Sequence, residues 1–393
     1  MDIKLDPELD EFRDQVRKMA QGILAPKAAY WDDHEEFPEE NRLKLAELGY
    51  WGLSIPEEYG GMGGSFMQAL ICVEEIARAC PNTSVISQLY LNNVAVHIAS
   101  LGSEEQKRRW LPKLATGEYF ANISLSEPHA GSAMTDMTTS ARIEGDEVVI
   151  NGAKCWCTAG HKLTHVLVVC RFGKSTGANG IGAVMVEAGT PGLTPGKPHS
   201  KMGMKGIGEV DMFLDQVRVP VENILVMGNP ENSDGFKRLF GSFGVERVGT
   251  AALSVGVASA ALEYAKRYTL ERSQFGRPLA EFQGLQWKIA DMATQIHAAR
   301  LMAYRVASNC KEWRKPDRQE TAMAKLFANE MVQRVTNEAM QMCGHLGYTK
   351  QAPVEQMYRD GRNWALAAGS VEILRNTIAE LEYGRKFSQR GKG

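Results

Sequence analysis

The stretch that decides the fold is Val-Leu-Val-Val-Cys at residues 166–170, a short run of apolar and mostly β-branched side chains. Similar runs stand at 147–151 (Glu-Val-Val-Ile-Asn), 183–186 (Ala-Val-Met-Val) and 210–214 (Val-Asp-Met-Phe-Leu). Glycine- and proline-rich turns bound these runs, and no long helical pattern separates one from the next. This spacing is typical of a compact antiparallel sheet or a small barrel and argues against a Rossmann unit.

On both sides of this β-rich part, apolar residues recur at helical spacing. The first helical stripe consists of Leu9, Phe12, Val16, Met19 and Ile23. Further helical patterns cover about 39–48, 65–79, 85–100, 104–115, 279–312, 318–343 and 369–385. A stretch rich in glycine, alanine and serine at 246–268 suits the central helix of a bundle.

The order of these patterns predicts an α+β fold with three domains. We expect an N-terminal helical domain at residues 1–118, a middle antiparallel β-domain at 119–232 and a C-terminal domain resembling a four-helix bundle at 233–393. A chain of 393 residues is long enough for two or three such units.

Composition excludes several classes of function. The chain is 44% hydrophobic and 23% charged, as in ordinary globular proteins. Its net charge of −2 disfavours nucleic-acid binding. No run of 18 apolar residues predicts a membrane span, and the first residues resemble neither a signal nor a transit peptide, so we expect a cytoplasmic protein.

The residues that often bind metals or form disulfides do not predict such sites here. Seven cysteines, an odd number in a long chain, argue against a disulfide framework. Cys155 and Cys157 flank Trp156 in a strand-like stretch, where we expect both to pack as small buried side chains. His161 and His165 lie between strand-like segments without a carboxylate motif, so no metal site is expected.

Five segments carry polar, aromatic and glycine residues in a fixed order along the chain. They are Ser126-Glu127-Pro128-His129-Ala130-Gly131-Ser132, the run from Ile150 to Thr158, the run from Arg218 to Leu225, the run from Arg272 to Ala293, and the pair of runs 341–348 and 359–370. Together these segments resemble the acyl-CoA dehydrogenase family, a group of flavin enzymes. One such motif is weak, whereas five in order over roughly residues 10–385 are specific.

The resemblance implies FAD as the cofactor, an acyl-CoA substrate and an electron-transfer flavoprotein as the electron acceptor. The positions that match the family's FAD contacts are Ile123, Leu125, Ser126, Gly131, Ser132, Trp156, Thr158, Arg272, Phe275, Gln283, Gln341, Gly344, His345, Ser370 and Glu372. In the family, the arginine and phenylalanine at 272 and 275 contact the FAD of a neighbouring subunit, which implies a homotetramer built as a dimer of dimers.

The usual catalytic position of the family is vacant. Most members have a glutamate, which removes the α-proton of the substrate, just before a Gly-Thr or Gly-Ser pair; this chain has Ala368 there. Isovaleryl-type and long-chain-type members take the glutamate from an earlier helix, directly before an arginine, and Glu246 before Arg247 matches that position. We therefore predict that Glu246 is the base and that FAD takes the β-hydride. The alternative is that Glu246 only complements the dipole of a helix N-terminus.

The remaining substrate contacts follow from the same resemblance. The backbone N–H of Ala368 would bind the thioester oxygen. Other positions expected to contact the substrate are Ser132, Arg247, Gly369 and Tyr90. No Lys or Arg occurs from 79 to 106, and only His97 could become cationic there, which favours a short, branched or cyclic neutral acyl group.

Three alternatives within the same fold stay open, and one of them is a flavin monooxygenase that does not use CoA. The segments 277–287 and 126–139 resemble a 3-sulfinopropionyl-CoA desulfinase, which lacks the catalytic glutamate and performs no net oxidation. An enoyl-CoA reductase would use the same site in reverse. Among the departures from the family, His345 replaces a glycine near the FAD diphosphate, and a side chain there is expected to require a re-shaped backbone.

Overall fold

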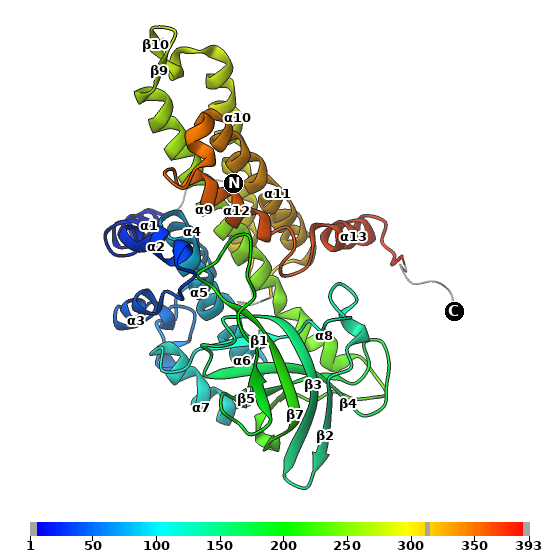
Figure 1. Ribbon diagram of the computed structural model, residues 1–393. Helices are drawn as coiled ribbons and strands as arrows, with labels where there is room; N and C mark the ends of the chain where they lie inside the picture. Colours follow the sequence, from blue (N-terminus) through cyan, green and yellow to red (C-terminus); the bar gives the residue numbers. More distant parts are fainter. Residues whose placement is uncertain (1–5, 311–314, 388–393) are drawn as a thin grey trace.

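The computed structural model describes residues 6–310 and 315–387, and a β-domain lies between two helical regions (Figure 1). The N-terminal helices are α1 (Pro7–Met19), α2 (Ala28–Asp33), α3 (Glu39–Glu47), α4 (Phe66–Ala79), α5 (Pro81–Asn92), α6 (Val94–Leu101) and α7 (Glu104–Ala115). The C-terminal elements are α8 (Asp234–Gly241), α9 (Phe243–Glu271), β9 (Ser273–Gln274), β10 (Arg277–Pro278), α10 (Gln283–Asn309), α11 (Arg318–Met342), α12 (Val354–Asn363) and α13 (Val371–Glu382).

The middle strands form one sheet of mixed direction. They are β1 (Ala121–Ser124), β2 (Ser140–Glu144), β3 (Glu147–Thr158), β4 (His165–Phe172), β5 (Ile181–Glu187), β6 (Leu193–Pro195), β7 (Glu209–Pro220) and β8 (Ile224–Val226). The order is β6-β7-β3-β2-β4-β5-β8, with β1 beside β4. Most pairs are antiparallel, but β1 and β2 both run parallel to β4, so the expectation of a purely antiparallel sheet is wrong in this respect.

Local signals explain where several helices begin and end. Ser65 with Gln68, and Ser103 with Gln106, form capping boxes at the starts of α4 and α7. The single helix expected over 85–100 is wrong, because Asn93 takes a non-helical conformation (φ −128°, ψ −117°) and separates α5 from α6. No glycine or proline stands at this break to announce it in the sequence.

The long helix α9 is the centre of the bundle and packs on α4, α10 and α11. Its small residues allow this contact: a Cβ on Gly256 would stand 2.2 Å from the carbonyl oxygen of Glu74, and a Cβ on Gly249 would stand 2.0 Å from the side chain of Gln88. Within the described residues, Asp234–Glu271 is long and apolar enough to cross a membrane by composition, but 78% of its most apolar window is buried in the fold. That burial accounts for its hydropathy as a core helix.

Two buried aspartates hold the β-domain against both helical regions. Asp32 of α2 accepts a hydrogen bond from the backbone N–H of Lys205, and Asp360 of α12 accepts one from the backbone N–H of Met204. Arg359 binds Asp32 at 2.7 Å. Burial, with the charge of Asp32 as a second cause, raises the pKa of Asp360 to about 7. We call Asp32, Asp360 and the loop 203–206 the interdomain clamp.

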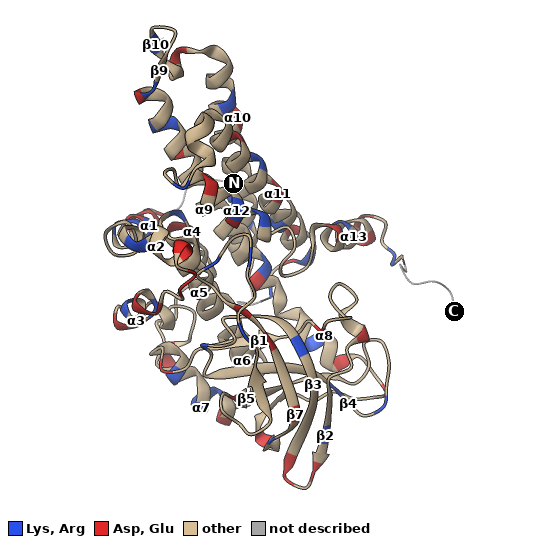
Figure 2. Cartoon of the chain, in the orientation of Figure 1, with Lys and Arg blue, Asp and Glu red and all other residues tan. Residues whose placement is uncertain are grey.

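The surface carries charges of both signs. Positions with Lys and Arg are interspersed with positions carrying Asp and Glu over the helical regions and the β-domain (Figure 2). Many of these charges are paired in exposed i,i+3 or i,i+4 ion pairs, which add little to stability. Among the described residues, no group of three or more His, Cys, Asp or Glu side chains is arranged to hold a metal ion.

Candidate active site

Glu246 stands in the first turn of α9 and is half-buried. Its Oε2 atom is fully buried, and no donor in the described part of the chain reaches it. Burial raises the pKa of Glu246 to about 7, although the charges of Arg247 and Lys325 act in the opposite direction. A carboxylate that served only the helix dipole would have a lowered pKa, so the environment of Glu246 suits a proton acceptor near neutral pH.

The loop that contains the vacant position, residues 364–370, lies against the same part of α9. Arg247 points its Nε toward the carbonyl oxygen of Ala368 at 3.4 Å, and its guanidinium also lies beside Gly369. Lys325 of α11 donates to the carbonyl oxygens of the same loop and acts on Glu246 electrostatically. These shared neighbours bring Glu246, Arg247, Ala368 and Gly369 into one site, as the sequence predicts.

Ala368 presents its backbone in an unusual way. Its φ is +53°, in the left-handed region that an alanine rarely adopts, and Gly369 follows with φ +92°. No acceptor in the described part of the chain reaches the N–H of Ala368 or of Gly369. Unpaired N–H groups on a strained turn are the donors that an oxyanion needs.

Lys325 is a buried neighbour of this site that sequence reasoning missed. It is fully buried and donates to the carbonyl oxygens of Trp364 (3.3 Å), Ala367 (2.9 Å) and Gly369 (3.0 Å). Burial lowers its pKa to about 7. One signal in the sequence was available: a lysine in the otherwise apolar run Ala322-Met323-Ala324-Lys325-Leu326-Phe327-Ala328 faces the core at helical spacing and must find partners there.

One face of α5 completes the site. Gln88 donates from Nε2 to the carbonyl oxygen of Glu246, and its Oε1 accepts a hydrogen bond from Asn92. The Oδ1 atom of Asn92 is buried without a partner in the described residues. His97, on the following helix, is buried beside Ser242, and burial lowers its pKa to about 4, so this histidine is neutral.

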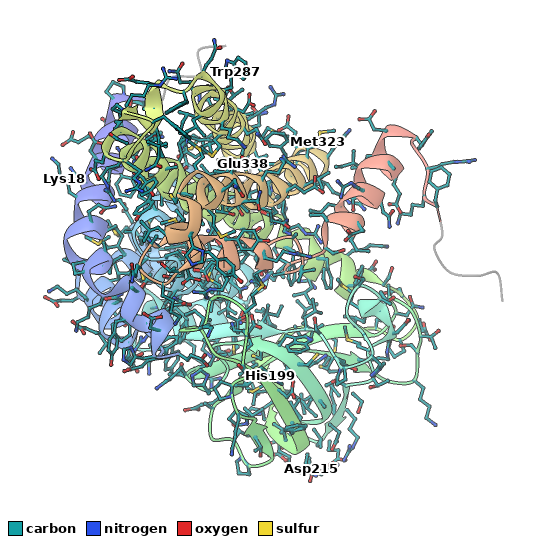
Figure 3. All side chains as sticks on the ribbon, turned by 45° about the horizontal axis from the view of Figure 1, so that its top comes forward. Lys18, His199, Asp215, Trp287, Met323 and Glu338 are labelled. Atoms are coloured by element: carbon teal, nitrogen blue, oxygen red, sulfur yellow. The ribbon has the colours of Figure 1, made fainter. Side chains whose placement is uncertain are left out.

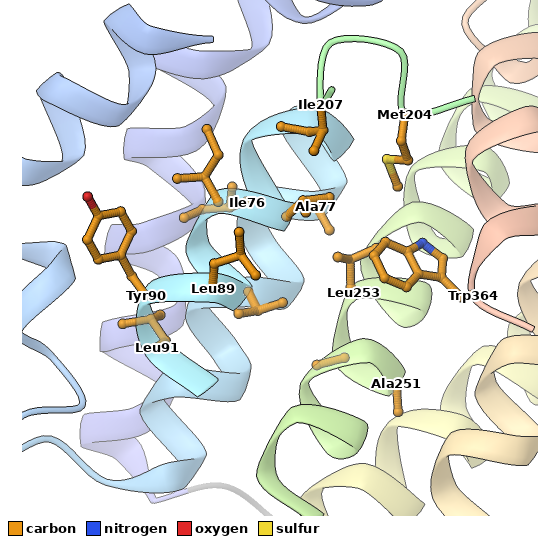
Figure 4. Packing of buried hydrophobic residues seen from close by; sticks show 14 of the residues in the cluster. Ile76, Ala77, Leu89, Tyr90, Leu91, Met204, Ile207, Ala251, Leu253 and Trp364 are labelled. Atoms are coloured by element: carbon orange, nitrogen blue, oxygen red, sulfur yellow. The ribbon is translucent and has the colours of Figure 1, made fainter. Parts of the chain in front are cut away.

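Tyr90, a predicted substrate contact, does not lie on this face of α5. Position 90 lies on the opposite side of α5 from Gln88, because two residues turn a helix by about 200°. The Tyr90 ring stacks between Trp51 and Phe120, and its hydroxyl accepts a hydrogen bond from Arg42. Figure 4 shows the ring pointing away from α9.

A second group of predicted residues meets at β3. The strand carries a bulge between Lys154 and Cys157, where Trp156 takes φ +59° and exposes 59% of its surface. Cys155 and Cys157 are both buried, as expected. The Cys155 N–H donates to the carbonyl oxygen of Ser126, which fixes the loop 125–132 beside the bulge.

A buried ion pair between Glu127 and Lys154 stabilises the loop 125–132. Glu127 binds the Nζ of Lys154 at 2.8 Å and accepts hydrogen bonds from the N–H groups of Thr138 and Thr139. Burial alone would raise the pKa of Glu127, but the charge of Lys154 and these hydrogen bonds outweigh it and lower the pKa to about 2. Lys154 also donates to the carbonyl oxygen of Leu125.

The surface beside Trp156 fits a flat conjugated ring with carbonyl acceptors, as in a flavin. Trp156 offers an exposed aromatic face, and His199 lies 4.9 Å from its ring. No acceptor in the described chain reaches the N–H of Leu125, Ser126 or Ser132. Thr158 is half-buried on the same strand, while the Ile123 side chain packs in the core, so Ile123 could contact a cofactor only through its backbone.

A third group forms a separate pocket of about 520 Å³ at the other end of the bundle. Its lining includes Arg272, Gln274, Gly344 and His345, with no carboxylate among the lining side chains. Gly344 takes φ +60°, whereas His345 is not in the left-handed region. The left-handed turn in this segment is thus made by Gly344, and His345 keeps an ordinary backbone conformation.

This pocket lies between residues 342–346 and the arm, by which we mean residues 262–290 around the β9–β10 hairpin. Figure 1 shows the arm at one end of the molecule and β3 at the other, and Figure 3 separates Trp287 from His199 in the same way. Phe275 is 94% exposed at the tip, and Gln283 and Gln341 are also exposed. Ser370 and Glu372 stand at the start of α13, where a hydrogen bond from the Ser370 side chain lowers the pKa of Glu372.

Known protein families match this chain along most of its length. The chain matches the N-terminal domain of acyl-CoA dehydrogenases over residues 6–118, the middle domain over 122–217 and the C-terminal domain over 233–381. A probable acyl-CoA dehydrogenase of Bacillus subtilis (strain 168) is 40% identical over 96% of this chain and 99% of that protein. An acryloyl-CoA reductase (NADH) of Anaerotignum propionicum is 36% identical over 96% of this chain and 95% of that protein.

Among solved structures, a glutaryl-coenzyme A dehydrogenase in complex with glutaryl-CoA has a TM-score of 0.93 and 35% identity, covering all of both chains. The agreement spans the helical regions, the sheet and the arm. The chain belongs to the acyl-CoA dehydrogenase family and is an oxidoreductase acting on the CH–CH group of acyl-CoA thioesters.

Proposed function

We propose that this protein converts a short, branched or cyclic neutral acyl-CoA to its 2-enoyl-CoA, with Glu246 as the base that accepts the α-proton. The observation that carries the proposal is the state of Glu246: an unpaired buried oxygen and a pKa raised to about 7 beside the vacant position 368. A carboxylate with this pKa is ionised in part at neutral pH and still basic enough to take a proton from carbon.

The loop supplies the other half of the chemistry. The N–H of Ala368 donates to the thioester oxygen and stabilises the negative charge that develops there as the α-proton leaves. The methyl group of Ala368 contributes no proton acceptor, and a backbone donor does not depend on the side chain. In this chain the proton acceptor comes from Glu246 and the backbone donor from Ala368, whereas in most of the family one residue supplies both.

FAD, when bound, accepts the β-hydride of the substrate. Trp156 and the loop 125–132 would hold its ring, because they combine an exposed indole with unpaired N–H groups. Ser126 and Ser132 would donate to the ring carbonyls, and Thr158 would lie at its edge. We further propose that an electron-transfer flavoprotein re-oxidises the cofactor.

A neutral acyl group fits the α5–α6 side of the site. From 79 to 106 the chain has no Lys or Arg, and the buried His97 is neutral at physiological pH. Arg247 and Lys325 are nearby cations, but both are engaged by carbonyl oxygens of the loop 364–370. An anionic tail would face Glu246 without a free counter-charge, which is unfavourable.

The arm supports a homotetramer in which neighbouring copies complete each cofactor site. Trp156 and the Arg272–His345 pocket of one chain lie toward opposite ends of the fold, so we propose that one FAD contacts these two places on different copies. Exposed apolar residues on the arm, Leu270 (65%), Phe275 (94%) and Trp287 (62%), suit burial against a second copy. We propose that the pocket holds the phosphate-bearing half of a neighbour's FAD.

The test is anaerobic reduction of the purified flavoprotein by a panel of acyl-CoA thioesters. Butyryl-, isobutyryl-, isovaleryl- and cyclohexanecarbonyl-CoA should bleach the visible flavin band of the wild type. The variant Glu246→Gln should keep the flavin but lose the bleaching. A variant that bleaches at the wild-type rate rules out Glu246 as the base, and a protein that takes up no flavin rules out the function.

The reverse reaction is the second candidate, because a relative at 36% identity is named an acryloyl-CoA reductase. It would use the same residues, with Glu246 returning a proton to the α-carbon. Oxidation of reduced enzyme by enoyl-CoA thioesters under a matched redox partner separates the two directions. Release of sulfite from 3-sulfinopropionyl-CoA without bleaching would instead support a desulfinase, which the empty side-chain position at Ala368 keeps open.

A further inference from the structure

The contacts of the loop 364–370 separate its carbonyl oxygens from its N–H groups. Lys325 binds the oxygens of Trp364, Ala367 and Gly369, and Arg247 lies near that of Ala368. The N–H groups of residues 368–370 have no acceptor in the described part of the chain. The cations of α9 and α11 therefore bind carbonyl oxygens of this loop, while its N–H groups at 368–370 remain without an acceptor in the described residues.

Peptide geometry turns this separation into an orientation. The carbonyl of Ala367 and the N–H of Ala368 belong to one planar trans peptide unit, so they point in opposite directions. Lys325 holds the Ala367 oxygen at 2.9 Å, and the Ala368 N–H must then point away from Lys325. A cation at the oxygen also polarises the peptide unit, which makes its N–H a stronger donor.

We propose that Lys325 is a positioning residue for the proposed reaction, orienting and polarising the Ala367–Ala368 peptide so that its N–H meets the thioester oxygen. This inference rests on the proposed function and adds a residue to it. Lys325 does not touch the substrate and acts only through the backbone of Ala368. Because Lys325 is fully buried beside Glu246 and Arg247, its amino group cannot hydrogen-bond water in place of the loop oxygens.

Asn329 provides a matched comparison on the same helix. It lies one turn after Lys325 and donates to the oxygen of Trp364, which Lys325 also binds. It has no contact with the Ala367 oxygen, and its own Oδ1 is held by Ser254. Loss of Asn329 thus loosens the loop without releasing the peptide that carries the donor.

The experiment measures the carbonyl stretch of bound pivaloyl-CoA by isotope-edited infrared spectroscopy. Pivaloyl-CoA has no α-hydrogen and cannot be oxidised, and a ¹³C label at its carbonyl isolates one band. Wild-type enzyme loaded with FAD should lower this frequency relative to free thioester. Lys325→Met should lose at least half of that lowering, whereas Asn329→Leu should retain it.

Kinetics provide a second readout on the same variants. With the acyl-CoA that bleaches the wild type fastest, Lys325→Met should lower kcat by about 10²-fold, the loss typical of an oxyanion donor, with KM changed less than threefold. Glu246→Gln should lose kcat while keeping the infrared shift. Failure of the base assignment and failure of the Lys325 proposal therefore give different results.

Three outcomes would overturn the proposal. The first is a folded, FAD-loaded Lys325→Met protein with the wild-type infrared band, and the second is a wild-type band that is not lowered. If Lys325→Met does not fold, Lys325→Gln, which retains a donor, should show a smaller but measurable loss of the shift. A crystal structure of the wild type with pivaloyl-CoA decides the matter without variants: a thioester oxygen turned away from the Ala368 N–H is the third contradicting result.

Discussion

Lys154 in the β-domain and Lys325 in the helical bundle are both buried near a glutamate, but they differ in the group that the lysine binds. In the β-domain, Lys154 binds Glu127 directly at 2.8 Å, and the pKa of Glu127 falls to about 2 because the lysine charge and three hydrogen bonds outweigh burial. In the helical bundle, Lys325 binds carbonyl oxygens instead, and burial raises the pKa of Glu246 to about 7. The first arrangement fixes a loop, and the second leaves a carboxylate ready to accept a proton.

The difference shows that burial alone does not determine the role of an ionisable residue. Both lysines are fully buried, with no side-chain exposure. What separates the pairs is the supply of donors: Glu127 has the N–H groups of Thr138 and Thr139, whereas the Oε2 atom of Glu246 has no donor among the described residues. A fully satisfied pair is structural, and an unsatisfied carboxylate is available for chemistry.

The largest expected effect is the loss of activity when the carboxylate of Glu246 is removed. Glu246→Gln should lower kcat by about 10²–10⁴-fold, because a positioned base supplies an acceleration of that order. Stopped-flow reduction of the flavin by the best acyl-CoA measures it. Glu127→Gln is the contrasting variant: it should lose stability and flavin before it loses the chemical step, and the opposite pattern would break the comparison.

The next largest effect is expected on stability, when the ion pair between Glu127 and Lys154 is broken. Lys154→Met should lower the free energy of unfolding by about 3–5 kcal/mol, because it leaves Glu127 charged and buried without its counter-ion. Urea unfolding followed by tryptophan fluorescence measures the change. The double variant Glu127→Leu with Lys154→Met should recover part of the loss, and a single variant as stable as the wild type would show that the pair contributes nothing.

The two carboxylates should also differ in their response to pH. Since Glu246 must be ionised to act, kcat/KM should fall about tenfold per unit as the pH drops below its pKa of about 7. Its pKa is higher in the folded protein than the usual 4.5, so the folded state binds more protons and stability falls as pH rises from about 4.5 to 7. For Glu127 the sign is reversed, and its contribution is lost as pH falls toward about 2.

Activity that is flat from pH 5 to 8 would contradict the assignment of Glu246. The stability slope has its own control, because Glu246→Gln removes one titrating group and should reduce the slope between pH 4.5 and 7, while Asp360, whose pKa is also raised to about 7, continues to contribute to it. Differential scanning calorimetry at several pH values measures this slope.

The smallest effect is expected at position 368. Ala368→Gly should stabilise the fold by roughly 1 kcal/mol, because glycine adopts φ +53° without the strain of a side chain. The N–H is kept, so turnover should stay within about threefold of the wild type by the same reasoning. A large loss of activity would show that the methyl group itself shapes the site.

Much of the architecture could be predicted from sequence because it rests on periodicity. The alternation of β-rich runs and helical stripes located the three parts of the chain, and the motifs around Ser126, Trp156 and Arg272 located surfaces that the structure exposes. The parallel pairing of β1 with β4 could not be predicted, because strand direction depends on the path of the connections and not on side-chain pattern.

The site could be predicted only in part, because a sequence pattern shows neighbours along the chain but not contacts between distant segments. Glu246 and Ala368 could be matched by their neighbours in sequence, but Lys325 meets the loop only in three dimensions, 43 positions before Ala368 along the chain. The face of α5 that meets α9 could not be read from the sequence, because α5 is buried along its whole length and has no polar side to orient it. Residues that act through long-range backbone contacts leave little trace in a local pattern.

The interdomain clamp limits how this chain can be divided. The loop 203–206 offers two successive N–H groups, and the carboxylates that receive them come from opposite ends of the sequence, at Asp32 and Asp360. A fragment that contains the sheet alone would leave both groups unpaired, and neither helical region alone could replace the missing partner. The β-domain has a sheet of its own, but the conformation of its loop 203–206 depends on both helical regions. When the middle segment is expressed by itself, this loop should no longer keep its conformation.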